Sequence, residues 1–529
     1  ADHVLGGTGR GDLVVWEPDE IGESAVIARR AIRGELEGIV WRKMPRNVAA
    51  NQMVLMTLCE GITPLSATTA LLKRTSIFDE WAPEETVALA RILDDRWLLR
   101  LVENPMSSDP LTWAPSLWRQ LAEGNEVPAE RPKAEEIEST EESELNRWRE
   151  IIREKLPNHL KEGWTSAGAR TRQYMMKHLS MIPDEQRYTV RDSVTRRPIG
   201  SVDEAFVLSL NDSGQETDGL PRRFVIVGRT WEIIEADPEK SELLVAPAGP
   251  GGHVPIWSGE LPPVPAEIAR EVGALRRKVK ELADGLDYEP AEENERIDLI
   301  GGTLPQTEIE DYPLAPDALE ILMTAVTEHV DAASNLPDER HIDVETRRDT
   351  IVVHSCNGNR INETLAHFLQ AMASTIEGRM GRVIVDPYRI SLQVPGLRAT
   401  HVVEWLTETP PEGLPSIMRV TIPNGRQLRW RLVQVCKVMG VLQSGVDPRK
   451  VNLSGIIQRY KGTPLMDEAL DKLFSERMDI DGTVDLLKAI QSGIVCVEQR
   501  SPGRLGVSPR TERDMQLPDW SNVEVRNRL

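Results

Sequence analysis

Apolar positions recur at helical spacing over much of this chain, and shorter runs rich in β-branched residues interrupt them. Apolar residues three and four positions apart predict helices at 21–33, 48–56, 65–73, 84–95, 266–282, 316–333, 360–376, 424–441, 452–475 and 481–492. Short runs between turn residues predict strands at 12–16, 98–102, 187–190, 206–208, 224–227, 243–245, 350–354, 388–393 and 494–498. The fold class that follows is multidomain, with α/β and α+β parts.

Shifts in this pattern divide the chain into seven segments. The first, 1–46, has the strand and helix of an incomplete α/β domain, and 47–104 has the three helices and ribbon of a winged helix. A Pro- and Glu-rich insert or linker follows at 105–146, and then a segment with a small β-barrel at 147–283. The remaining segments are an acidic loop (284–312), an α/β and helical part (313–500) and a polar tail (501–529).

Charge is distributed unevenly along the chain. The net charge of −21 argues against a nucleic-acid partner. However, residues 147–197 hold twelve Lys or Arg against six acids, and residues 418–461 hold nine against one. Residues 123–144 hold nine acids and two basic residues. Two basic segments in an acidic chain indicate phosphate contact, although either one alone is equally compatible with ordinary solvated charge.

The sequence offers little support for chemistry within the chain. It has no GxxxxGK[ST] loop, so no Lys and backbone amides are expected to hold a nucleotide's phosphates. The DExH-like run 338–341 lacks such a loop before it and is interpreted as coincidence. A Cys/His pair at Cys356 and His354 is conceivable, but a structural histidine is the commoner role. The four dispersed cysteines predict neither a zinc site nor disulfides, and indicate a reducing, cytoplasmic setting. No segment is apolar enough to predict a membrane span.

Tryptophan is unusually frequent, with thirteen Trp against five Phe. Trp231 follows Arg229 by two positions on a predicted strand, so both side chains are expected on one face. That pair suits a base stack beside a phosphate contact, and a Trp in the core of the barrel is an equal alternative. In the second basic segment, Arg426, Arg429 and Arg431 lie within about one and a half turns of a predicted helix and form a basic face.

Ordered blocks over nearly the whole chain resemble the Lhr (large helicase-related) family of superfamily 2 helicases, in its archaeal form. The first blocks are the Gly-rich start 1–11, the helix 25–37 and the run Asn47–Gln52. The later blocks lie at 182–188, 200–206, 229–233, 245–248, 254–260, 265–268, 352–364 and 386–390. The chain departs from the family at 179–181, where many members have Gly-Gly-Thr, and in its long acidic insert.

The resemblance implies the C-terminal portion of a 3′-to-5′ translocase on single-stranded DNA that unwinds DNA or RNA–DNA hybrids, with a role in DNA repair. It implies a monomer whose missing RecA-like domains use ATP and Mg²⁺. This chain alone is then expected to bind neither and to have no catalytic residue. By the resemblance, 1–46 ends the second RecA-like domain, with His3, Gly7 and Arg10 near its motif VI. These residues are expected to be the least stable part of the chain.

Within the same interpretation, segments 147–283 and 313–500 form the large domain that guides the strand. The stacking role of a family Trp is assigned to Trp231. The expected backbone contacts are Arg172, Lys177, Arg187 and Arg229, with Arg426, Arg429 and Arg431 in the second cluster. Two alternatives come from other classes of protein: a glycosylase-like module that processes flipped bases, and a docking scaffold without affinity for nucleic acid.

Overall fold

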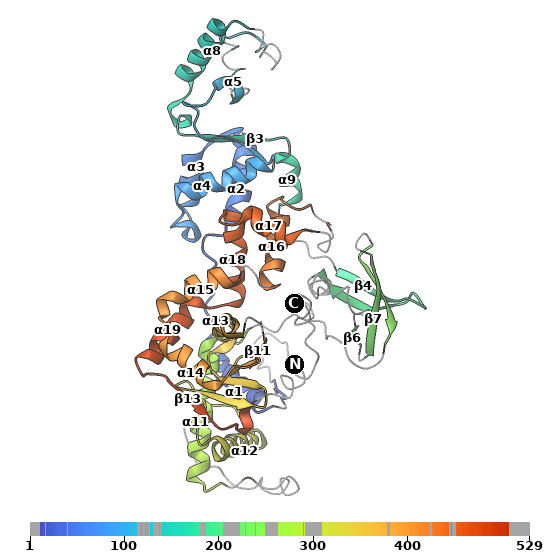
Figure 1. The fold of residues 1–529 in the computed structure, drawn as a ribbon, viewed down its shortest axis with the longest axis vertical. Coiled ribbons are helices and arrows are strands. Elements are labelled where there is room, and N and C mark those ends of the chain that lie inside the picture. The colour runs from blue at the N-terminus through green and yellow to red at the C-terminus, as the bar shows by residue number, and fades with distance from the viewer. Residues whose placement is uncertain are drawn as a thin grey trace, which may run out of the picture. The chain divides into compact units, whose positions relative to one another are not determined.

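The computed structural model describes residues 11–506, and the description leaves out some positions within that range. These are 16, 40, 114–117, 119–121, 123, 125–126, 131–136, 138–139, 180, 182–186, 205–222, 228, 238–239, 249–262, 289, 291–308, 378–380, 423–425, 444–445 and 447–450. The chain forms two compact units (Figure 1). The first unit comprises Ala1–Ile39, Arg187–Arg426 and Leu473–Leu529, and the second comprises Val40–Gln186 and Gln427–Lys472.

The second unit is built around three helices and a small antiparallel sheet. The helices are α2 (Arg46–Glu60), α3 (Leu65–Leu72) and α4 (Pro83–Asp95). The strands are β1 (Ile62–Pro64), β2 (Leu99–Val102) and β3 (Trp164–Ala167), in the order β1-β3-β2. The central strand β3 lies far beyond the expected end of this module at residue 104. Sequence proximity could not reveal it, because 61 residues separate β2 from β3 (Figure 1).

The insert between β2 and β3 has a core of its own. Helix α8 (Glu142–Lys155) buries Leu145, Trp148 and Ile152. Trp118 packs edge-on against Trp148, with 5.7 Å between ring centroids, and its indole N–H donates to the carbonyl of Pro128 at 3.0 Å. Of the two expectations for 105–146, an insert or a linker, these contacts are those of an insert with packed side chains. The few large apolar side chains of this segment are dispersed among acidic residues, so its composition does not predict a core.

The segment 427–472 joins the three-helix module through buried polar contacts. Its helices are α16 (Arg426–Val438), α17 (Leu453–Tyr460) and most of α18 (Pro464–Arg477). Arg46, at the start of α2, contacts both Glu85 at 2.9 Å and Asp471 at 2.6 Å. Glu468 is fully buried, and its carboxylate accepts from the Arg46 amide at 2.8 Å and from Arg42 at 2.7 Å. Arginine and carboxylate groups from distant parts of the chain thus hold the second unit together.

The first unit contains a five-stranded sheet in the order β11-β12-β10-β9-β13. Its strands are β9 (His341–Arg347), β10 (Thr350–His354), β11 (Arg382–Asp386), β12 (Arg389–Gln393) and β13 (Cys496–Arg500). Only the β13–β9 pairing is parallel. The long helices of this part are α11 (Ala266–Gly285), α12 (Pro316–Ala333), α13 (Gly358–Glu377), α14 (Ala399–Glu408), α15 (Leu414–Thr421) and α19 (Ile480–Gln491). Among the described residues, no helix is long and apolar enough to cross a membrane.

Helix α1 (Pro18–Arg33) lies in the segment 1–46, which was expected to be the least stable part of the chain, and it packs into this core. Its Ile21, Ala25 and Val26 are buried among residues of α11 and α12. The expected strand at 12–16 is not formed by the described residues 11–15, where Leu13 and Val14 are exposed. A strand needs a neighbour to satisfy its backbone groups, whereas a helix satisfies its own and needs only an apolar face to pack.

A buried ion network fixes α1 in place. The Asp19 carboxylate accepts from Arg276 of α11 at 2.6 Å and pairs with Arg389 of β12. Arg389 also donates to Asp386 at 2.9 Å and to the carbonyl of Leu505. Burial alone would raise the pKa of Asp19, but Arg389 and Arg276 beside it hold that pKa below its ordinary value. Three segments distant in sequence therefore meet at the Asp19 carboxylate, and Arg389 connects the segment at Leu505 to them.

A second sheet in the first unit is formed by residues 187–247. Its order is β5-β4-β8-β7-β6, with β4 (Arg187–Asp192), β5 (Pro198–Asp203), β6 (Arg223–Ile226), β7 (Arg229–Asp237) and β8 (Glu242–Pro247). One face buries Tyr188, Val190, Phe224, Trp231 and Leu243. The expected barrel is not closed by the described strands, which form an open sheet with β5 and β6 at its edges. The expected strand at 206–208 lies outside the described residues.

A buried histidine pair lies beside the larger sheet. His329 of α12 and His354 of β10 have ring centroids 5.6 Å apart, and both are almost fully buried. The Nδ1 atom of His329 accepts from the Leu505 amide at 3.0 Å, which requires the neutral ring. Burial, and then His354, lower the pKa of His329 to about 3. The nearby Glu345 carboxylate accepts from the Gly503 amide at 3.0 Å, so both groups hold the segment after β13.

We predict that Asp19→Asn destabilises α1 far more than a change at its surface. Removing the carboxylate leaves Arg276 buried without a counter-ion and Arg389 with Asp386 alone, which costs about 3–5 kcal/mol. Hydrogen exchange of the α1 amides should accelerate strongly. The matched control is Asp311→Asn, which removes an exposed partner of Arg33 on the same helix and should cost at most about 1 kcal/mol. Equal effects of the two variants would contradict the assigned role.

We also predict that His329 makes the first unit sensitive to mild acid. The unfolded chain binds a proton to this ring near pH 6.5, whereas the folded pKa is about 3. Stability is therefore complete above about pH 6.5 and falls as the pH drops toward 3. In His329→Asn, the urea midpoint between pH 7.5 and 4.5 should change less than in the parent. His159→Asn, at an exposed histidine of the other unit, should leave the change of the urea midpoint with pH unaltered. The same change in His329→Asn as in the parent would refute the prediction.

Candidate nucleic-acid interface

Helix α9 (Thr171–Lys177) presents two of the expected contact residues. Arg172 and Lys177 are both exposed, and Met176 between them is 69% exposed. The opposite face is held firmly, because the Tyr174 hydroxyl donates to the carbonyl of Val438 at 2.9 Å and Tyr174 and Met175 are buried. The helix thus has one face fixed in the second unit and a cationic face open to solvent.

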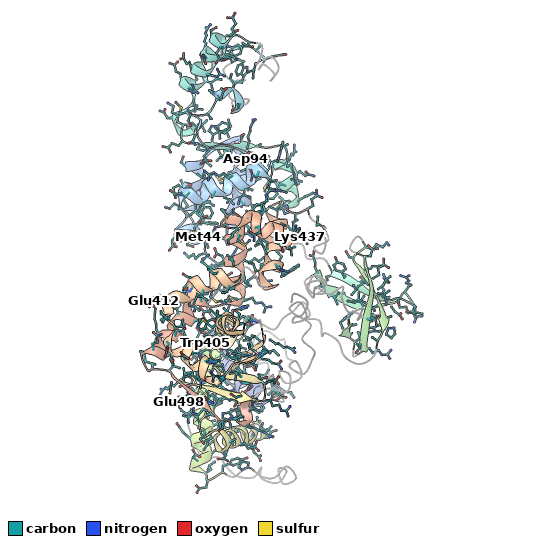
Figure 2. The ribbon with its side chains drawn as sticks, viewed as in Figure 1. Met44, Asp94, Trp405, Glu412, Lys437 and Glu498 are labelled. Carbon is teal, nitrogen blue, oxygen red and sulfur yellow. The ribbon has the colours of Figure 1, made fainter. Side chains whose placement is uncertain are left out.

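The start of α9 is held against Trp97 and Leu98, which lie between α4 and β2. The Thr171 hydroxyl donates to the carbonyl of Leu98 at 2.5 Å, and the Gly168 amide donates to the Thr171 hydroxyl at 2.7 Å. The Arg170 amide donates to the carbonyl of Trp97 at 3.1 Å. These bonds place the end of α4, marked by Asp94 in Figure 2, next to the start of α9. Residues 73 positions apart in sequence therefore lie next to each other.

The second expected cluster lies on α16 but is less open. Arg429 and Arg431 are half-buried, and both already interact with other residues of the chain. Leu428 and Leu432 beside them are fully buried. The side chain of Arg426 lies outside the described residues. Helical spacing correctly predicted that these arginines share a helix, but it could not show that most of that helix packs inside the unit.

The remaining candidates belong to the small sheet of the first unit. Arg187 and Arg229 are exposed at the first residues of β4 and β7. Because β8 pairs parallel with β4 and antiparallel with β7, these two arginines lie at opposite ends of the sheet. They do not form a single patch. The motor residues His3, Gly7 and Arg10 lie outside the described residues.

Trp231 lies in the core of that sheet. Its side chain is 7% exposed, and its indole N–H donates to the carbonyl of Ile226 at 3.3 Å. Its cross-strand neighbours are Phe224 and Pro247. Of the two alternatives that the sequence left open, this placement is that of a core tryptophan. Arg229, two positions earlier, is exposed, so the two side chains are not presented together.

An exposed aromatic residue that sequence reasoning missed lies beside α9. Trp97 is 69% exposed and has a φ of 62°. Left-handed backbone is rare for a bulky side chain. The available signal was its position directly after a helix end, where glycine is the usual residue.

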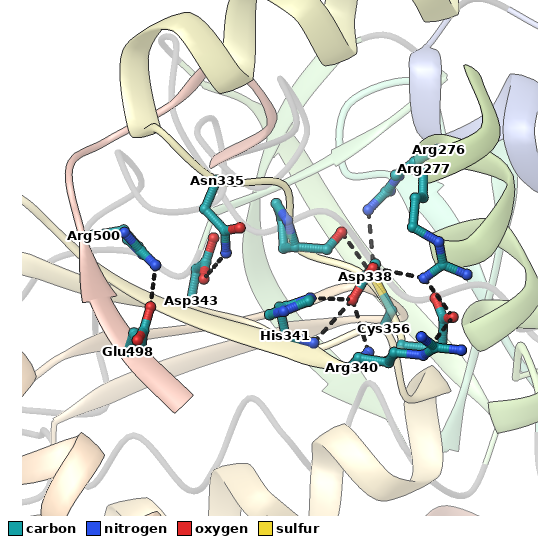
Figure 3. A network of polar contacts seen from close by, with 12 residues as sticks. Arg276, Arg277, Asn335, Asp338, Arg340, His341, Asp343, Cys356, Glu498 and Arg500 are labelled. Carbon is teal, nitrogen blue, oxygen red and sulfur yellow. Dashed lines mark hydrogen bonds and ion pairs between the residues drawn. The ribbon is translucent and has the colours of Figure 1, made fainter. Parts of the chain in front are cut away.

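The DExH-like run has a structural role. Asp338 is 4% exposed, and its carboxylate accepts from the Arg340 and His341 amides at 2.8 and 2.9 Å. It also contacts Arg277 of α11 at 2.9 Å (Figure 3). Glu339 contacts the same guanidinium at 2.7 Å. These contacts form the turn that leads into β9. This structural role agrees with the interpretation of the DExH-like run as a coincidence.

Cys356 and His354 do not form a catalytic pair. Both are nearly fully buried, and burial raises the pKa of the Cys356 thiol to about 11. A guanidinium N–H of Arg276 points at the sulfur at 3.5 Å. The Nε2 atom of His354 lies 3.4 Å from Glu345 instead. Among the residues that the structure describes, no group of His, Cys, Asp and Glu is placed to hold a metal ion.

Comparison with known proteins connects this geometry to one family. The DEAD/H associated family model matches residues 336–506. The ATP-dependent helicase Lhr-Core of Sulfolobus acidocaldarius is 20% identical over 361 residues, which are 65% of this chain and 39% of that protein. The ATP-dependent helicase Lhr-Core protein 2 of Thermococcus barophilus is 24% identical over 351 residues, 62% of this chain and 36% of that protein.

A solved helicase structure is also similar to this chain. The Mycobacterium smegmatis helicase Lhr, bound to single-stranded DNA and AMP-PNP, matches with a TM-score of 0.56 and 16% identity over 92% of this chain and 50% of that chain. This chain thus spans less than two fifths of the curated relatives and half of the solved one, coverage consistent with the expected portion of such a helicase. The resemblance found in the sequence is confirmed: the chain is a relative of the Lhr helicases and carries a DEAD/H associated domain at residues 336–506.

Proposed function

We propose that this chain is a nucleic-acid-binding and strand-guiding portion of an Lhr-type ATP-dependent helicase. The observation that carries the proposal is the exposed cationic face of α9, held rigidly on the three-helix module of a chain related to Lhr-Core helicases. Cations fixed on a surface attract the phosphate backbone without reading its sequence. Arg172 and Lys177 are the preferred contacts.

The three helices α2–α4 with strands β1–β3 are proposed to be a winged helix. Its third helix, α4, is followed directly by the strand pair β2–β3, as in a wing. The large acidic insert extends that wing at the end away from α9, because it leaves β2 after Val102 and returns at Trp164, which pair with each other. Nucleic-acid binding is therefore proposed at the opposite end of strands β2 and β3, where Leu99 pairs with Ala167.

The whole helicase is proposed to translocate 3′-to-5′ on single-stranded DNA, to unwind DNA or RNA–DNA hybrids and to serve DNA repair. ATP and Mg²⁺ would be handled by RecA-like domains, because the printed sequence has no GxxxxGK[ST] loop. The relatives are named ATP-dependent helicases, and the solved helicase was bound to single-stranded DNA and AMP-PNP, which supports this division of labour. Residues of this chain would then guide the strand.

We expect the chain to bind a single-stranded oligonucleotide with an affinity that falls as salt rises. Each phosphate contact contributes about 0.7 to the slope of log affinity against log salt for single strands. The double variant Arg172→Ala, Lys177→Ala should therefore lower the magnitude of the slope by roughly 1.4. Fluorescence anisotropy of labelled (dT)20 between about 50 and 200 mM NaCl gives this slope.

The matched control removes two other exposed cations, Arg348 and Lys488, both in the first unit. Its slope should equal that of the parent. A salt-independent affinity of the parent would overturn the proposed function. Equal losses in the two double variants would show that only total charge matters, and would remove α9 from the interface.

For Trp231 we expect an effect on folding and not on binding. Trp231→Ala should cost about 3–5 kcal/mol of the stability of the small sheet, because it empties a buried position. Trp231→Phe fills most of that space and should leave oligonucleotide affinity within twofold of the parent. A folded Phe variant that binds more than fivefold weaker would instead assign Trp231 to base stacking.

A further inference from the structure

Trp97 occupies a backbone position that disfavours it. The Trp97 amide donates to the carbonyl of Asp94 at 2.8 Å, and the Leu98 amide donates to that of Leu93 at 2.9 Å. This pair of bonds is the glycine-type ending of a helix, in which the residue after the C-cap is left-handed. Trp97 takes that conformation, with a φ of 62°, although its Cβ is crowded there.

The indole ring of Trp97 buries little of its apolar surface against the rest of the chain. It is 69% exposed, so most of its apolar surface remains in water. A smaller residue, and glycine above all, would satisfy the same helix ending without strain. The chain thus holds a large flat apolar group at the surface in a rigid frame, which is a feature of binding sites.

The surroundings of Trp97 indicate an anionic, aromatic-bearing ligand. Its carbonyl accepts from the Arg170 amide at 3.1 Å, and the Arg170 guanidinium contacts the carbonyl of Arg96 at 3.4 Å. Arg172 is exposed two residues beyond Arg170. Asp94 and Asp95 are exposed on the α4 side, so the cations are concentrated on the α9 side of the ring.

Gly168 allows this close approach. A Cβ at Gly168 would lie 2.7 Å from the carbonyl oxygen of Trp97 and 3.2 Å from the carbonyl carbon of Leu99. Both are backbone atoms, which cannot move aside easily. The turn 168–170 therefore holds the backbone of Trp97 and the start of α9 in a fixed relation. An aromatic face beside a row of cations is the combination that binds single strands, since bases stack while phosphates pair.

We propose that Trp97 is a stacking platform for a base of single-stranded DNA, at the point where the strand passes between the end of α4 and α9. This inference rests on the proposed function and adds to it a specific base contact. The phosphates on either side of the stacked base would face Arg170 and Arg172.

The test uses the full chain and the variant Trp97→Gly. Glycine suits the left-handed position, so the midpoint of thermal unfolding should stay the same or rise by a few degrees. The affinity for (dT)20 should nevertheless fall about tenfold, as expected for one lost stack. Trp97→Tyr keeps a ring and should retain most of the affinity. The matched control is Trp41→Gly, at a tryptophan of the same unit that is 73% exposed, and it should bind like the parent.

An oligonucleotide with abasic residues separates stacking from charge. The parent should bind it about as weakly as Trp97→Gly binds (dT)20, and Trp97→Gly should lose little further affinity. If the parent binds (dT)20 in a salt-dependent way but Trp97→Gly binds equally well, only the stacking proposal fails. If the parent does not bind (dT)20 at all, the proposed function itself fails. A lowered unfolding midpoint in Trp97→Gly would show a structural role and also overturn the stacking proposal.

Discussion

One carboxylate, that of Asp19, determines how the first unit is assembled. It accepts from Arg276 and pairs with Arg389, and Arg389 in turn donates to the carbonyl of Leu505. The Arg276 guanidinium could not remain buried without it, because an unpaired charge is too costly in a protein interior, whereas Arg389 also pairs with Asp386. A helix near residue 20, a helix near 276, a strand near 390 and a segment near 505 are therefore mutually dependent. The DEAD/H associated domain of residues 336–506 is completed by residues far outside its own range.

In the second unit, too, buried charged groups join segments that are far apart in the sequence. Arg46 and Glu468 join the three-helix module to the segment 427–472. Tyr174 then fixes α9 to the end of α16. Rigid support of this kind gives the exposed side chains of α9 and of Trp97 defined positions. A surface that guides a moving strand needs such positions, because a mobile side chain would lose more entropy on each contact.

Long periodic elements could be predicted from the sequence, and residues with buried charge could not. The helix at 316–333 and the strand at 350–354 were predicted with the bounds that the structure shows. Strand β9 was missed, because its seven residues include only two large apolar side chains, Ile342 and Val344, among charged and polar ones. Asp343 and Glu345 are in fact buried: Glu345 meets His354 and Arg347, and Asp343 accepts from Asn335 at 2.8 Å. Whether a charged residue is buried depends on its partners elsewhere in the chain, and a local sequence pattern does not show those partners.

The candidate site shows the same limit. Arg172 and Lys177, which the sequence suggested as backbone contacts, are exposed in the structure, but the sequence could not show that Trp97 lies beside their helix. The most direct test of the whole account is hydrogen exchange of the full chain with and without (dT)20. The account predicts slower exchange at 94–101 and 168–177, with α1 unchanged. Slower exchange confined to other segments would contradict it.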